Sequence, residues 1–100
     1  LDAAKTKGVW GIGVDADQAY LGAHILTSAV KKVDVAVLDT IKSIADGNFQ
    51  GGADGVYGLA EDGVGLGEIA PAAKQYEAKL APVIEDIKAG KIDIPTEPSN

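Results

Sequence analysis

Two carboxylates, Asp15 and Asp17, stand at the end of the apolar stretch GVWGIGVDADQ. An aspartate at a strand end has two acceptor oxygens and can hold a pair of neighbouring hydroxyls, such as a sugar diol. It can equally cap the following turn by accepting bonds from backbone amides. Two acids separated by one residue could also hold a metal ion and activate water for hydrolysis. The residues themselves leave these three roles open.

Two lysines, Lys31 and Lys32, end the next apolar segment, shortly before a helix expected to begin at Asp34. A lysine opposite a carboxylate in a cleft can donate hydrogen bonds to the same hydroxyl groups. Lysines before a helix are also commonly plain solvated charges. Both lysines are therefore either ligand residues or surface residues at this point.

Two known binding motifs are partly matched around Asp15, but each lacks residues that it requires. DADQAY starts like an EF-hand loop, but Ala19, Tyr20 and Leu26 occupy positions that need an oxygen ligand, a glycine and a glutamate. Gly11 and Gly13 lie inside the expected strand, whereas the glycines of a dinucleotide fingerprint lie in the turn after it. These two glycines are expected to allow close packing of neighbouring backbone instead.

Composition narrows the function classes further. The chain has one histidine, His24, and no cysteine, so no zinc site of several imidazoles or thiolates and no disulfide framework can form within it. The net charge is −6 and all nine basic residues are lysines. Nucleic-acid binding requires clustered positive charge, so no nucleic-acid partner is expected. We also expect no cofactor.

The elements that must position the acids and lysines alternate between strand and helix. GVWGIGVD lacks polar alternation, which predicts a buried strand of a parallel sheet. Proline has no backbone N–H to donate inside a helix, so Pro82 is expected either to start a second helix or to kink the one that runs from Glu68. The order predicts an α/β fold with a mainly parallel sheet. Extended segments are expected at 8–15, 24–31 and 53–59, and residues 61–66 are expected to form a turn that leads to another short extended piece. Helical segments are expected at 2–7, from an N-cap at Asp34 to Gly47, and from Glu68 to Gly90.

The chain contains no methionine, and its first residues, LDAAKTKG, have the pattern of a helix end closed by Gly8. We therefore expect it to be a piece of a longer protein. Its strings GVWGIGV and ADGVYGL would then expose apolar edges that seek another chain. The piece is expected to be ordered only with the rest of its parent chain or with other copies of itself.

Three strings occur in order: KGVWGIGVDADQ, ILTSAVKKVDVAVLDTIK and GVYGLAEDGVGL. Together they resemble the C-terminal portion of the basic membrane protein family of bacterial lipoproteins, the purine nucleoside receptor A-like substrate-binding proteins of ABC transporters. The resemblance extends to the closing AGKIDIP and covers essentially the whole chain. Its specific part is the pair IGVDxDQ and LTSxxKxVD, which a general periplasmic sugar-binding protein would not share.

The resemblance implies a type I periplasmic-binding-protein fold, Rossmann-like with mainly parallel sheets, in which two α/β lobes joined by hinge crossings close around a ligand. Residues 1–100 would be its C-terminal segment. Residues 8–33 would supply strands of one lobe and a crossing, and 34–47 a helix on the other lobe. Residues 53–94 would supply a further strand and helices.

The resemblance also assigns roles to individual residues. The family's ribose-contacting aspartate falls in GVD and carries over to Asp15, and its ribose-contacting lysine falls in LTSxxK and carries over to Lys31 rather than Lys32. The family's base-stacking aromatic residues and a ribose-contacting glycine lie upstream and have no counterpart here. Asp17 is expected to be a structural acid.

The function that the resemblance implies is binding without catalysis. The protein would bind purine nucleosides outside the cytoplasm of a bacterium, anchored to the membrane by lipid or free in the periplasm, and deliver them to an ABC transporter permease. One alternative is another sugar-like ligand in the same fold. The other is a metal-assisted nucleoside hydrolase that uses Asp15 and Asp17.

Overall fold

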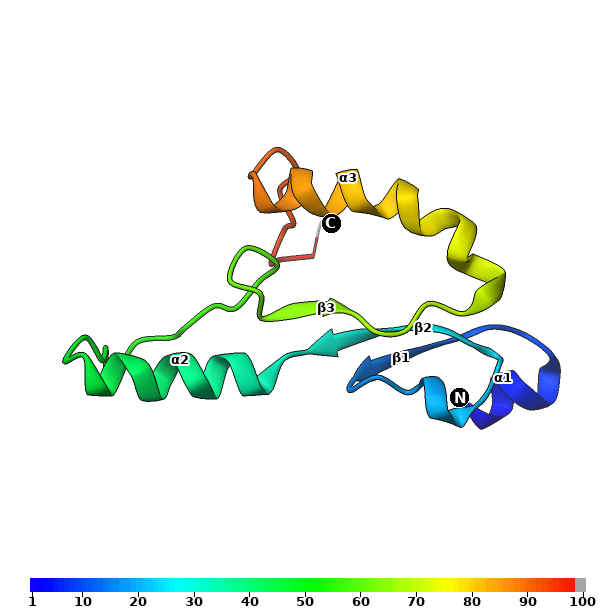
Figure 1. Ribbon diagram of the computed structural model, residues 1–100, viewed down its shortest axis with the longest axis horizontal. Coiled ribbons are helices and arrows are strands. Elements are labelled where there is room, and N and C mark those ends of the chain that lie inside the picture. Colours follow the sequence, from blue (N-terminus) through cyan, green and yellow to red (C-terminus); the bar gives the residue numbers. More distant parts are fainter. Residues whose placement is uncertain (99–100) are drawn as a thin grey trace.

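The computed structural model describes residues 1–98 (Figure 1). Its centre is a three-stranded sheet in the order β1-β2-β3. The strands β1 and β2 run parallel, and β3 joins the other edge of β2 antiparallel. The α/β architecture expected from the sequence is present, with one parallel and one antiparallel pair. The strands are β1 Gly11–Asp15, β2 Ile25–Lys31 and β3 Val64–Leu66.

One α-helix precedes the first strand, one lies between β2 and β3, and one follows the last strand. Gly8 and Gly90 end the first and last helices in the left-handed conformation, at φ 66 and 73°, which glycine adopts without steric cost. These two stops agree with the sequence-based prediction. The α-helices are α1 Asp2–Lys7, α2 Val33–Ala45 and α3 Glu77–Lys88, and the 3₁₀ helices are η1 Ala19–Leu21 and η2 Pro71–Tyr76.

The strand predicted at 53–59 is wrong, because this segment is irregular. A strand needs a neighbour for its backbone groups, and the free edge of β2 is taken by β3. Residues 58–63 instead form a turn, in which the Gly63 amide donates to the Gly58 carbonyl. The strand predicted at 8–15 begins only at Gly11.

Two helix boundaries also differ from the prediction. Lys32, and not Asp34, occupies the N-cap position of α2, and no side chain caps this helix. Asp34 lies in the first turn, where its negative charge favours the helix N-terminus. Pro82 lies inside α3 and does not begin it. The change from 3₁₀ helix to α-helix comes earlier, where η2 ends at Tyr76 and α3 begins at Glu77.

Little of the described chain is buried. The buried apolar residues are Ile25, Ala70 and Ala73. The predicted burial of the first strand holds for one face only, since Ile12 and Val14 on the other face are 57 and 60% exposed. The radius of gyration is 16.7 Å, against about 13 Å for a compact domain of 100 residues.

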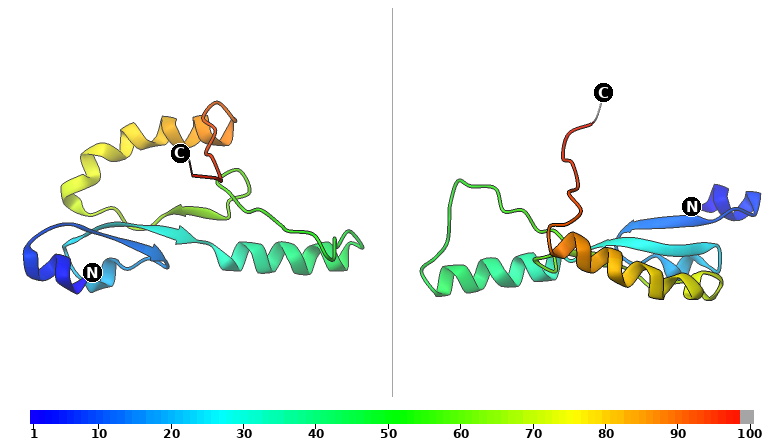
Figure 2. Two further views of the ribbon diagram at one scale, coloured as in Figure 1. Left: turned by 180° about the vertical axis from the view of Figure 1, so that it is seen from behind. Right: turned by 90° about the horizontal axis from the view of Figure 1, so that it is seen from above.

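The elongation comes from α2, which continues beyond β2 and away from the sheet, whereas α3 lies on the side of β3 (Figures 1 and 2). None of the residues of α2 is buried. The assignment of 8–33 and 34–47 to two different lobes stays a prediction. Within residues 1–98, no helix combines the length and the apolar character needed to cross a bilayer.

Candidate functional site

Asp15 and Lys31 meet at one edge of the sheet. They are the last residues of β1 and β2, and parallel strands bring their carboxyl ends to the same edge. Asp15 is in register with Val30, so Lys31 lies one residue further along. The Lys31 Nζ atom is 3.4 Å from Asp15 Oδ1. In open α/β sheets, ligands bind beyond this edge.

Both charged groups of this pair face solvent. The side chain of Lys31 is 65% exposed and that of Asp15 is 73% exposed, so their ion pair contributes little to stability. An ammonium with three donors and a carboxylate with two acceptor oxygens remain accessible to a ligand. This combination can bind adjacent hydroxyls, each of which both donates and accepts.

The backbone of Asp15 takes an uncommon conformation. Its φ is 73°, in the left-handed region that residues other than glycine seldom adopt and in which aspartate is enriched. The strand ends there, and the Ala16 amide turns back to donate to the Val14 carbonyl over 3.1 Å. Asp15 thus lies within a tight turn at the end of β1, with its carboxylate beside Lys31.

Lys32 is held elsewhere. Its ammonium forms a hydrogen-bonded ion pair with Asp62, and its amide donates to the Gly63 carbonyl over 2.8 Å. The hydrogen bond from Lys32, followed by its charge, lowers the pKa of Asp62. Lys32 thus joins the end of β2 to the turn before β3, while Lys31 stays at the open edge with Asp15.

Asp17 is occupied by hydrogen bonds within the chain. Its Oδ1 accepts from the Ser28 hydroxyl and the Ala19 amide, both at 3.2 Å, and its Oδ2 accepts from the Glu68 amide at 2.8 Å. The Glu68 amide is the largest cause that lowers the pKa of Asp17, with smaller contributions from Ala19 and Ser28. The contacts agree with the structural role expected for Asp17.

The metal-dependent alternative finds no support in these contacts. Both oxygens of Asp17 already serve backbone and hydroxyl donors, and Asp15 pairs with a lysine. In the part of the chain that the structure describes, no three His, Cys, Asp or Glu residues gather as metal ligands would.

Ser28 is the residue that the sequence-based reasoning missed. It is fully buried in β2, and its hydroxyl accepts from the Gln18 amide at 3.0 Å while donating to Asp17. Gly13 on β1 lies opposite it in register. A small polar residue inside an apolar strand, with a glycine in the neighbouring strand, was the available signal.

Two hollows adjoin the pair. One, of about 510 Å³, lies at the carboxyl edge and is lined by Asp15, Ala16, Lys31, Val33 and Asp34. The other, of about 440 Å³, is almost wholly apolar and lies between the sheet and α3. The pair therefore borders one hollow whose lining includes the charged residues Asp15, Lys31 and Asp34, and a second hollow that is almost wholly apolar.

Comparisons with known proteins assign the chain to a family. The family model described as ABC transporter substrate-binding protein PnrA-like matches residues 1–97. The ABC transporter nucleoside-binding protein BmpA of Lactococcus lactis is 36% identical over 109 residues, which cover 97% of this chain and 31% of that protein. The chain thus spans about a third of the length of this relative.

Two crystal structures are similar in fold. A transcriptional activator of the comK gene from Bacillus halodurans superposes with a TM-score of 0.82 at 28% identity, covering 91% of this chain and 32% of that one. An ABC transporter solute-binding protein from Aeropyrum pernix gives a TM-score of 0.65 at 26% identity, covering 98% and 36%. With the family model matching nearly its whole length, the chain belongs to the PnrA-like family of ABC transporter substrate-binding proteins.

Proposed function

We propose that the protein binds purine nucleosides as the ligand-binding component of an ABC transporter and delivers them to a permease. Asp15 accepts hydrogen bonds from the ribose hydroxyls and Lys31 donates to them. The single observation that carries this assignment is the pairing of these two exposed, opposite charges at the carboxyl edge of the parallel strands.

Three further observations support a nucleoside as the ligand. The relative from Lactococcus lactis is named a nucleoside-binding protein. A ribose presents neighbouring hydroxyls that match one acceptor and one donor group. The chain has no arginine, the residue best suited to clamp a phosphate, and a nucleoside carries none.

The place of the protein in the cell follows from the same proposal. A substrate-binding protein of an ABC importer meets its ligand on the outer side of the membrane. We therefore place this protein outside the cytoplasm, at the membrane surface or in the periplasm. Protease added to intact cells or spheroplasts would degrade it there, whereas a cytoplasmic protein would be spared.

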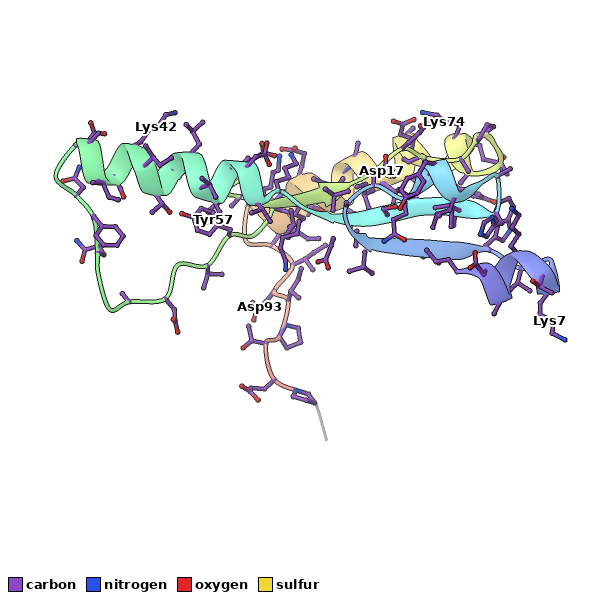
Figure 3. The ribbon with its side chains drawn as sticks, turned by 90° about the horizontal axis from the view of Figure 1, so that it is seen from below. Lys7, Asp17, Lys42, Tyr57, Lys74 and Asp93 are labelled. Atoms are coloured by element: carbon purple, nitrogen blue, oxygen red, sulfur yellow. The ribbon has the colours of Figure 1, made fainter. Side chains whose placement is uncertain are left out.

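Calorimetry on the protein at its full natural length tests the assignment. Asp15→Ala and Lys31→Ala should each weaken inosine and guanosine binding roughly 30- to 1,000-fold, because each removes a charge-assisted hydrogen bond from the ligand. Lys7→Ala and Asp93→Ala are matched controls, since Figure 3 places both residues away from the sheet. Affinities of both site variants within threefold of the unsubstituted protein would refute the roles.

The second candidate is another sugar-like ligand in the same site. It shares the observation that carries the first, because any vicinal diol fits the Asp15–Lys31 pair. Titration with inosine, guanosine, adenosine and free ribose separates the two. Ribose binding as tight as inosine binding would favour the sugar. Release of free base from inosine would instead indicate the hydrolase.

A further inference from the structure

Three segments that lie far apart in the sequence meet at Asp17. The residue follows β1, its Oδ1 binds Ser28 on β2, and its Oδ2 binds the Glu68 amide, 51 residues away on the segment after β3. We call Asp17, Ser28 and the Glu68 amide the clamp. The clamp joins the loop after β1 to β2 and to the segment that follows β3.

The backbone around the clamp is fitted closely to it. A Cβ atom added at Gly13 would lie 2.5 Å from Ser28 Oγ, and one added at Gly67 would lie 2.6 Å from the Asp17 carboxyl carbon. Real Cβ atoms essentially never make contacts under 3.0 Å. Only glycine therefore leaves room for the Ser28 hydroxyl and the Asp17 carboxylate at their observed positions.

The clamp reaches Asp15 through Gln18. The Gln18 amide donates to Ser28 Oγ at 3.0 Å, and its side-chain amide donates to the Val14 carbonyl at 2.8 Å. The turn from Val14 to Gln18 is thus fastened at both ends, with Asp15 inside it. A non-glycine residue at φ 73° persists only where its surroundings hold it there.

We infer that Asp17 is a positioning residue, which through Ser28 and Gln18 holds the Asp15 turn so that the Asp15 carboxylate stays beside Lys31. This inference rests on the proposed function, since its consequence for binding requires that Asp15 meets the ligand. Both oxygens of Asp17 already accept hydrogen bonds from the chain, which gives this carboxylate a role in holding the backbone.

The test uses Asp17→Asn and Ser28→Ala in the protein at full natural length. An asparagine turns an NH₂ donor toward one of the three donors that Asp17 accepts from, so at least one bond is lost. Ser28→Ala leaves the carboxylate and its bond from Glu68 in place, and serves if Asp17→Asn folds poorly. Asp86→Asn is the matched control, because Asp86 also accepts a side-chain bond, from Lys91, but at the end of α3.

Two readouts separate positioning from a general loss of structure. We expect Asp17→Asn and Ser28→Ala each to weaken inosine binding at least tenfold. Added to Asp15→Ala, either substitution should weaken binding less than twofold relative to Asp15→Ala alone. In the ligand-free protein, the NMR backbone shifts of Asp15 should move away from left-handed values. Asp86→Asn should change neither quantity.

Where Asp15→Ala weakens inosine binding, the inference is overturned if both clamp variants keep their inosine affinity within twofold, or if their losses are equally large in the Asp15→Ala background. It is also overturned if the Asp15 shifts do not move. A failure of the proposed function looks different. Asp15→Ala would then bind inosine like the unsubstituted protein, and the backbone shifts of Asp15 in the Asp17→Asn variant would still decide whether the clamp holds the turn.

Discussion

Substituting Gly13 by alanine tests the packing between β1 and β2 directly. Gly13 is buried and faces Ser28 in register. An added methyl group would lie 2.5 Å from Ser28 Oγ and 2.9 Å from the Gln18 Cβ atom. Neither neighbour can easily withdraw, because Ser28 is fully buried and Gln18 is hydrogen-bonded at both its backbone and its side chain.

The magnitude follows from these contacts. Non-bonded carbons need about 3.5 Å, so the Gln18 Cβ must move by roughly 0.6 Å. Overpacking of a fitted interior costs about 1–3 kcal/mol. Displacing Ser28 Oγ from the Gln18 amide removes a hydrogen bond worth about 0.5–1.5 kcal/mol. Gly13→Ala should therefore lower the free energy of unfolding by about 2–4 kcal/mol.

Urea unfolding of the protein at full natural length measures this loss. Gly51→Ala is the control, because a Cβ atom there would meet only Phe49, at an ordinary 3.5 Å. That variant should stay within about 0.5 kcal/mol of the unsubstituted protein. If Gly13→Ala is as stable as the unsubstituted protein, the close fit between Gly13 and Ser28 does not hold, and Ser28 is not fixed sterically by β1.

Three further predictions follow from charge and burial. Lys32→Met should raise the pKa of Asp62, measured in a carbon-13 NMR titration. Because folding lowers the pKa of Asp62, the Lys32–Asp62 pair stabilises the fold above about pH 4. This stabilisation is lost as the pH falls through the lowered pKa. Ser28→Ala should raise the pKa of Asp17 only in part, since the Glu68 amide is the largest cause that lowers it; a complete return to the usual value would contradict these contacts. The isolated 100-residue chain should associate or fail to fold cooperatively, because its described residues bury so few apolar side chains. Light scattering and urea unfolding at micromolar concentration check this, and a monomer with a concentration-independent midpoint would refute it.

The parts of this chain that the sequence alone determined are local. Gly8 and Gly90 end helices because glycine takes the left-handed conformation at low cost, and that preference is carried by the residue itself. The strand ending at Asp15 and the one ending at Lys31 were recognisable from their apolar runs. The family was recognisable from strings of residues in order, which the family model confirms.

Tertiary structure decided what depends on a distant partner. Both 53–59 and the end of 61–66 were expected to be extended, but only Val64–Leu66 forms a strand, because it is the segment whose backbone groups pair with the edge of β2. The role of Asp17 depends on an amide 51 residues away, which no local pattern reveals. Lys31 likewise approaches Asp15 to 3.4 Å because β1 and β2 pair in parallel. The register of that pairing is fixed by the backbone hydrogen bonds between the strands together with the fit of Gly13 against Ser28.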